Sequence, residues 1–208
     1  MKKKTTEYNM SFTTGGLLFQ ESVRVANLYH EIGNWKKVRE QVVVQNILQS
    51  RTLTTSKKLT GEICSRLEFL NQGELQILAE GNSQEQSHIL WLAICRKYKF
   101  IREFSVEVIR EKFLTLKYEL TYSDFDTFFN AKAAWSDELD SITDSTRKKL
   151  RQVLFRLLHE IGLLSANNRI NPMVLSSRVV NAVDNSSLED LTVFPVSQKD
   201  LKQIGCNK

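Results

Sequence analysis

Four cations lie within five positions of the chain: Arg147, Lys148, Lys149 and Arg151. They fall in the first turns of an expected helix, where the helix dipole makes each cation unfavourable by a few tenths to about 1 kcal/mol. Exposed backbone N–H groups and basic side chains at a helix start bind anions, and phosphate is the anion that DNA and RNA present. The cluster therefore indicates a phosphate contact, unless Asp140 and Asp144 neutralise it locally.

A second basic cluster lies in the first third of the chain. Its members sit at expected helix starts or in the loop between two expected helices: Lys36, Lys37, Arg39, Arg51, Lys57 and Lys58. Two such clusters in one fold could bracket a duplex, the alternative being solvated faces. A further cation, Arg169, lies on an expected ribbon from which it could reach a groove of DNA.

A third basic run has a different context. It comprises Arg96, Lys97, Lys99 and Arg102, and three carboxylates follow it: Glu103, Glu107 and Glu111. Residues three or four apart on a helix are neighbours, so this spacing suits helical ion pairs. The run is interpreted as structural and not as a ligand-binding site.

Signatures of catalysis are absent from the sequence. The three histidines, His30, His88 and His159, stand without the spacing of a zinc site, and Gly15-Gly16 is not followed by the lysine of a phosphate-binding loop. Acidic residues in the middle of the chain include Asp124 and Asp126, which fit the first turn of a helix, where carboxylates favour the dipole. We expect no catalytic residue, metal or cofactor, and a nuclease is disfavoured.

The elements that carry these residues are predicted to be helices. Only two prolines and eight glycines interrupt the 208 residues, and apolar residues recur at three- and four-residue spacing. The expected helices cover 17–32, 35–47, 59–70, 74–80, 83–95, 100–116, 123–135, 143–161 and 176–183. The helix over 123–135 carries the aromatic residues Phe125, Phe128, Phe129 and Trp135, which are predicted to be core.

The end of the chain changes character. Residues 169–171 and 192–196 are expected to be short strands that pair as a two-stranded ribbon, and Ser197 to Asp200 would cap a last short helix. Residues 147–196 could then form a winged-helix-like unit. The fold class is therefore mainly α, a multi-helix globular protein with a small C-terminal ribbon. An N-terminal helical region over 8–140 and a C-terminal region over 141–208 are expected, if the chain is not one compact unit.

Charge is segregated along the sequence. Residues 1–60 carry a net +6, residues 61–145 a net −6, and residues 146–208 a net +5. Three cysteines without a CxxC pair predict neither disulfides nor zinc, which suits a reducing cytoplasm. The most apolar run, 89–95, is far shorter than the roughly 20 residues that a membrane-spanning helix needs, and no signal peptide is recognised. No membrane association is expected.

Several segments together resemble the BrxA family, the small component of bacterial BREX phage-defence systems. They are Tyr8-Asn-Met-Ser-Phe-Thr-Thr-Gly-Gly-Leu-Leu, Trp35…Arg39-Glu40…Asn46, Leu90-Trp-Leu-Ala-Ile-Cys-Arg and Ser145-Thr-Arg-Lys-Lys-Leu-Arg-Gln-Val-Leu-Phe. The resemblance covers residues 8 to about 175. It implies a non-enzymatic, cytoplasmic, mainly helical DNA-binding protein, similar in part to the NusB-like fold, and it brings no catalytic residues.

Three functional hypotheses follow from the sequence. The first is a DNA-binding accessory protein that docks double-stranded DNA through phosphate contacts, with little or modest sequence preference because no clear recognition-helix pattern is present. The second is a scaffold whose acidic middle and basic ends bind other BREX proteins. The third is an RNA-binding protein, as the NusB likeness would allow. The oligomeric state is not predicted.

Overall fold

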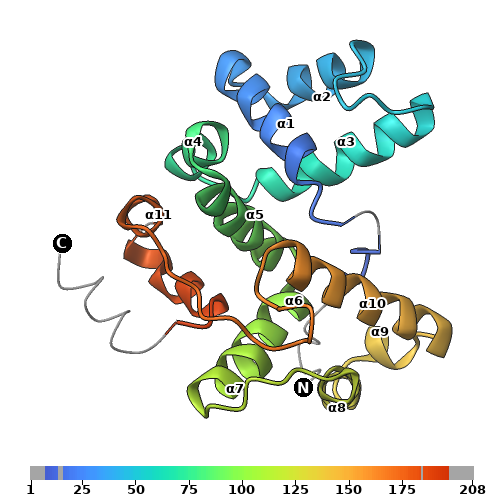
Figure 1. Ribbon diagram of the computed structural model, residues 1–208. Helices are drawn as coiled ribbons and strands as arrows, with labels where there is room; N and C mark the ends of the chain where they lie inside the picture. The colour runs from blue at the N-terminus through green and yellow to red at the C-terminus, as the bar shows by residue number, and fades with distance from the viewer. Residues whose placement is uncertain (1–7, 14–15, 184, 197–208) are drawn as a thin grey trace, which may run out of the picture. The chain divides into compact units, whose positions relative to one another are not determined.

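A computed structural model describes residues 8–13, 16–183 and 185–196 of the chain. Over these residues the regular structure is helical, which confirms a mainly α fold (Figure 1). Internal contacts divide the chain into two compact units. Unit 2 comprises 17–97 and 174–191, and unit 1 comprises 1–16, 98–173 and 192–208.

The boundary expected between residues 140 and 141 does not coincide with this division. Residues on both sides of that boundary lie in unit 1. The physical reason is that arginines after the boundary pair with Asp126 before it. The chain also leaves unit 1 for unit 2 and returns, so neither unit is continuous in sequence.

Unit 2 is built around a helix that is buried along most of its length. Its helices are α1 (Phe19–Ile32), α2 (Trp35–Val44), α3 (Leu53–Leu67), α4 (Gln72–Glu80), α5 (Ser83–Lys97) and α11 (Ser177–Ala182). In α5 every residue from His88 to Cys95 is buried, which explains why its apolar residues form a continuous run instead of a stripe. Figure 1 shows α2 and α3 as neighbours, with α1 packed beside both.

The ends of these helices follow from local sequence chemistry. Asn71 and Glu74 form a reciprocal capping box at the start of α4, in which each side chain accepts a hydrogen bond from the other residue's backbone N–H. Gly33 ends α1 with φ 67°, a left-handed conformation that glycine adopts without steric cost. The expected end of the first helix at Gly33 is therefore confirmed.

The described part of unit 1 contains a π-helical segment and five α-helices. They are α6 (Lys99–Phe104), the π-helical segment (Ser105–Arg110), α7 (Glu111–Leu114), α8 (Tyr122–Ala133), α9 (Asp137–Asp140) and α10 (Asp144–Glu160). The Phe100 ring lies edge-on to those of Phe125 and Phe128, with centroids 5.7 and 5.2 Å apart. This confirms the predicted aromatic core except at Trp135, which lies beyond the end of α8 and is 78% exposed.

The expected C-terminal ribbon is not found in the described residues. Arg169 and Ile170 do pair with extended backbone, but through single antiparallel bridges to Glu119 and Leu164. Residues 192–196 follow or overlap a 3-10 helix (Asn185–Val193), and a long hydrogen bond of 3.5 Å joins the Met173 N–H to the Pro195 carbonyl.

Proline lacks the N–H group that a strand ladder requires, which works against a strand at this position. The described residues therefore lack the ribbon that the predicted winged-helix-like unit requires. The helix expected to begin at Ser197 lies outside the described residues. In the described chain no helix has the length and apolar character to cross a membrane.

Candidate nucleic-acid interface

The α10 cluster begins a helix whose ends match the sequence prediction. The Thr143 side chain caps α10 by accepting from the Thr146 N–H, and Gly162 beyond its end has φ 83°. Leu150, Leu154 and Leu158 are buried on one face. The cations of the first turns are thereby held at fixed positions in unit 1.

Arg147 is engaged within the protein and not free for a ligand. Its guanidinium donates to the Asp126 carboxylate at 3.2 Å, to the Asp126 backbone carbonyl at 2.9 Å and to the Asn130 amide oxygen at 2.7 Å. It also lies over the Phe129 ring, 4.7 Å from the centroid. All these partners come from α8.

Arg151 shares the same carboxylate. Its guanidinium pairs with the second oxygen of Asp126 and lies 4.6 Å from the centroid of the Tyr122 ring. The side chains of Arg147 and Arg151 are only 21% and 19% exposed. The sequence indicated local neutralisation by Asp140 and Asp144 as the alternative to phosphate, and the observed counterion is Asp126.

Lys148 and Lys149 complete the cluster and are exposed. Among the described residues neither side chain has an ion pair or hydrogen bond. A shallow cavity of about 290 Å³ is lined by Asp126, Asp144, Arg147, Lys148 and Arg151. Because it contains two carboxylates, this cavity is a poor receptor for phosphate.

Replacing Asp126 with alanine is expected to lower the free energy of unfolding by about 1 kcal/mol. The estimate reflects two partly exposed ion pairs, which are each worth less than buried ones. Urea denaturation of the full-length protein would measure the loss of stability. Asp140→Ala is the matched control, because Asp140 is exposed and has no ion pair in the described structure. Equal stability of the two variants would contradict the assigned role of Asp126.

The second cluster lies on α2, α3 and their connection, all in unit 2. The Asn34 side chain caps α2 and the Thr52 side chain caps α3. Arg39 near the start of α2 pairs with Glu68 just beyond the end of α3, at 2.8 Å. The two helices are therefore antiparallel, and the cations divide between the two ends of the pair.

Five of the six cations in this cluster are uncommitted. They are exposed, and no ion pair or side-chain hydrogen bond joins them to the described residues: Lys36, Lys37, Arg51, Lys57 and Lys58. Residues 34–68 contain seven Lys and Arg against three Asp and Glu, a net +4. Two of the acids, Glu62 and Glu68, are already paired. We call the five residues the α2–α3 basic surface.

The connection between α2 and α3 is tightly specified. Asn46 and Gln49 have φ of 47° and 51°, a left-handed conformation that is uncommon for residues other than glycine. The Asn46 side chain exchanges hydrogen bonds with the Ser50 backbone at 2.9 and 3.2 Å. Arg51 therefore follows a loop whose backbone conformation is fixed, and its own backbone position is defined.

The third basic run is structural, as predicted, although most of its partners differ from those expected. Arg96 pairs with Glu74 at 2.6 Å and with Asp190 at 2.7 Å, and Lys97 pairs with Glu62 at 2.8 Å. The contact of Lys99 with Glu103, at 3.7 Å, does follow the anticipated helical spacing. Arg169 is exposed on unit 1, but without the ribbon that was expected to present it.

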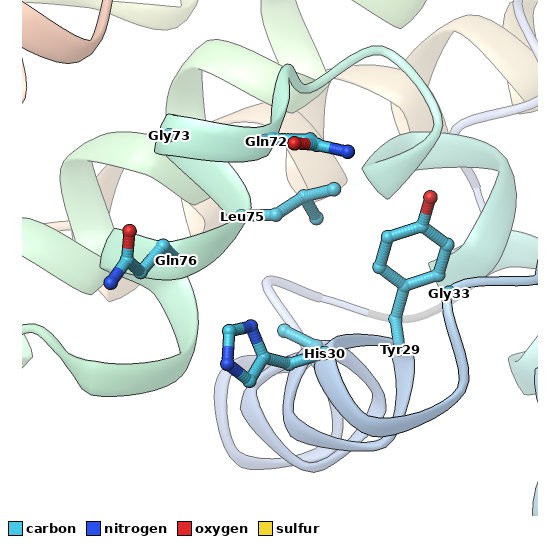
Figure 2. Close-up of a pocket in the computed structure, with 8 residues that line it drawn as sticks. Tyr29, His30, Gly33, Gln72, Gly73, Leu75 and Gln76 are labelled. Atoms are coloured by element: carbon cyan, nitrogen blue, oxygen red, sulfur yellow. The ribbon is translucent and has the colours of Figure 1, made fainter.

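The sequence reading missed a cavity of about 520 Å³ between α1 and α4 (Figure 2). Its lining residues are Ala26, Tyr29, His30, Gly33, Gln72, Gly73, Leu75 and Gln76. Tyr29 stacks on Trp35, the first residue of α2, with ring centroids 4.0 Å apart and planes inclined by 22°. No motif in the sequence assigns Trp35 to a site, and α4 approaches α1 through tertiary packing that no local pattern reveals.

The described residues contain no group of three or more side chains suited to holding a metal ion. Asp124 forms a capping box with Thr121, as predicted for a carboxylate in a first helical turn. His159 lies 2.9 Å from the Asn168 amide oxygen, and His88 is buried inside unit 2.

Burial lowers the pKa of the His88 imidazole from its ordinary 6.5 to about 4, although the Glu85 carboxylate opposes the shift. Below pH 6.5 the unfolded chain binds a proton at this position that the folded chain does not. Stability is therefore expected to fall by up to about 3 kcal/mol as the pH drops from 6.5 to 4. His88→Leu should flatten this part of the profile, measured by urea denaturation. Parallel profiles for the two proteins would contradict the assignment.

Comparison with known proteins supplies the family. A family model described as BrxA matches residues 6–187. A protein named BREX protein BrxA from Bacillus cereus (strain H3081.97) is 29% identical over 183 residues, covering 86% of this chain and 92% of that protein. Another of the same name, from Escherichia coli O9:H4 (strain HS), is 27% identical over 157 residues, covering 76% of this chain and 74% of that protein.

One solved structure has a fold similar to that of this chain. It is described as an uncharacterized protein from Magnetospirillum magneticum, and it matches with a TM-score of 0.75 at 20% identity. The match covers 91% of this chain and 98% of the solved one. The family model spans most of the sequence, and the resemblance drawn from its motifs is confirmed: the chain belongs to the BrxA family.

Proposed function

We propose that this protein is a non-catalytic accessory component of a BREX system, acts in the cytoplasm, and binds double-stranded DNA mainly through phosphate contacts. The observation that carries the proposal is the α2–α3 basic surface, with five exposed cations that no described acid neutralises. Named relatives are BREX proteins, and the family resemblance implies a DNA ligand.

Of the two basic clusters, which the sequence leaves unranked, the α2–α3 basic surface is the better candidate for the contact. At α10, the Asp126 carboxylate already pairs with two of the four cations, so a phosphate would have to compete with it for Arg147 and Arg151. Binding at Lys36 or Lys57 replaces only water and counterions. Release of condensed counterions from DNA favours such contacts.

The spacing of the α2–α3 basic surface suits an extended polyanion. Lys36 and Lys37 lie at the start of α2, and Lys57 and Lys58 lie near the start of α3, at the opposite end of the antiparallel pair. A helix of ten residues is about 15 Å long, which sets the approximate separation of the two groups. One small anion cannot bridge that distance, whereas successive phosphates of a nucleic acid can.

A second candidate function is a scaffold for other BREX proteins. Two large apolar side chains of unit 1 are strongly exposed, Leu116 at 72% and Trp135 at 78%. Leu116 also has φ 61°, an unfavourable conformation for a bulky residue. Exposed aromatic side chains are frequent anchors in protein interfaces. Both functions are compatible, because these residues lie in unit 1 and the α2–α3 basic surface lies in unit 2.

Gel-shift titration of the full chain with duplex DNA and structured RNA, across a salt series, tests the proposal. We expect the duplex to bind and its affinity to fall steeply with salt. Preference for RNA would favour the NusB-like alternative. No shift with either nucleic acid at low salt would reject the proposal and leave the scaffold function.

A further inference from the structure

We propose that the cavity between α1 and α4 binds the heteroaromatic base of an unpaired nucleotide, whose phosphate lies on Lys36 and Lys37. The base could belong to a DNA strand or to a free nucleotide. If the base belongs to a DNA strand, this inference rests on the proposed function. The experiment below distinguishes a base in DNA from a free nucleotide.

The walls of the cavity have the chemistry that a base requires. Figure 2 shows the Tyr29 ring extending from α1 on the side of Gln72 and Leu75 of α4, and the His30 imidazole extending on the side of Gln76. Leu75 is 7% exposed and supplies an apolar floor. No Asp, Glu, Lys or Arg lines the cavity, so it suits a neutral planar ring better than a charged group. Its volume of about 520 Å³ lies in the range of small-molecule sites.

Tyr29 provides a rigid aromatic surface. One face of its ring is covered by the Trp35 indole in a stacked arrangement, yet Tyr29 also lines the cavity. The rest of the ring is therefore available to a ligand. Every nucleic-acid base has a π-face, and stacking on an aromatic side chain does not depend on its sequence.

Three polar groups at the cavity are uncommitted. Within the described part of the chain, no hydrogen bond engages the Tyr29 hydroxyl, the His30 imidazole or the Gln72 amide. Gln76 differs, because its amide donates to the Glu80 carboxylate at 3.1 Å. An amide and an imidazole together offer donors and acceptors, as the edge of a base does.

The α2–α3 basic surface begins directly beside this cavity. Gly33 lines the wall, Trp35 backs Tyr29, and Lys36 follows in sequence. Three Cα–Cα steps of about 3.8 Å place the Lys36 Cα no more than about 11 Å from that of Gly33. A lysine side chain can span much of this interval, so one nucleotide could place its base in the cavity and its phosphate on the lysines.

The test uses fluorescence titration with three probes: a paired duplex, the same duplex with one extrahelical fluorescent adenine analogue, and free adenosine monophosphate. We expect the duplex with the unpaired base to bind about tenfold more tightly than the paired duplex, from stacking of one base. Stacking on Tyr29 should also quench the analogue. The double variant His30→Ala, Gln72→Ala should remove most of the preference.

Matched variants separate a binding role from a structural one. Tyr29→Phe retains the ring and should retain the preference, whereas Tyr29→Leu should lose it. Gln84→Ala is the control, because Gln84 is an exposed glutamine of unit 2 that does not line the cavity. If Tyr29→Leu fails to fold by circular dichroism, the His30 and Gln72 variant still decides the outcome.

Equal affinity for the two duplexes, without quenching, would overturn the inference and leave the proposed function standing. Binding of adenosine monophosphate that depends on Gln72, without binding of either duplex, would support a free-nucleotide site and reject the proposed function. If none of the three probes binds, both are rejected.

Discussion

Replacing Arg96 with methionine is expected to lower the free energy of unfolding by about 3–5 kcal/mol, because it leaves a buried carboxylate without its counterion. Glu74 is completely buried and receives two guanidinium N–H groups of Arg96, at 2.6 and 2.8 Å. Arg96 also donates to Asp190 and to the Phe69 carbonyl. The substitution would therefore disturb α4, α5 and the segment carrying Asp190 together.

Urea denaturation monitored by circular dichroism measures this effect. Lys99→Met is the matched control, since Lys99 belongs to the same basic run but its contact with Glu103 is 3.7 Å long and its side chain is 43% exposed. The control should lose less than about 1 kcal/mol. Adding Glu74→Gln to Arg96→Met should restore part of the stability by removing the buried charge. A loss below 1 kcal/mol for Arg96→Met would contradict the buried ion pair.

Replacing the five residues of the α2–α3 basic surface with glutamine is expected to weaken duplex binding by about a hundredfold near 0.1 M salt. The estimate follows from losing up to five phosphate contacts, each of which releases counterions in the wild type. The residues are exposed and uncommitted, so the fold should be preserved. Fluorescence anisotropy with a labelled duplex measures affinity, and circular dichroism checks the helices.

A control variant removes four exposed cations from unit 1: Lys117, Lys148, Lys149 and Arg169. We expect it to weaken binding by only a fewfold. It leaves Arg147 and Arg151 in place, because replacing them would also break their ion pairs with Asp126. If the control loses more affinity than the α2–α3 variant, the α10 side of the protein makes the principal contact and the present assignment is wrong.

Local signals in the sequence predicted the helices well where each end has a chemical marker. Thr143 and Gly162 bracket α10, and Asn34 precedes α2 as its cap. Leu150, Leu154 and Leu157, at three- and four-residue spacing in the sequence, are buried on one face of α10. These features depend on residues within one or two helical turns, which a single sequence contains.

The features that the sequence did not predict depend on contacts between distant segments. Asp126 pairs with arginines 21 and 25 positions away, whereas the sequence suggested the nearer Asp140 and Asp144. Only helix packing decides which carboxylate lies beside Arg147. The predicted strand at 192–196 is likewise contradicted by the observed 3-10 and irregular backbone. Short apolar runs are compatible with several backbone conformations, and tertiary context chooses among them.

The sequence predicts both basic clusters, but it does not indicate which of them makes the phosphate contact. Lys36 and Arg147 both sit near helix starts with other cations around them. Their difference is that Arg147 pairs with Asp126 and lies over the Phe129 ring, while no ion pair or cation–π contact joins Lys36 to another described residue. That distinction comes from the structure and makes the α2–α3 basic surface the preferred site.

The most direct test of the account is the salt dependence of duplex binding by the wild type and by the five-residue glutamine variant. On a plot of log affinity against log salt, each neutralised phosphate contributes a slope of about −0.9. If all five cations contact phosphate, the variant's slope should be shallower by about 4.5. Identical slopes for the two proteins would contradict the assignment of the α2–α3 basic surface as the DNA-binding site.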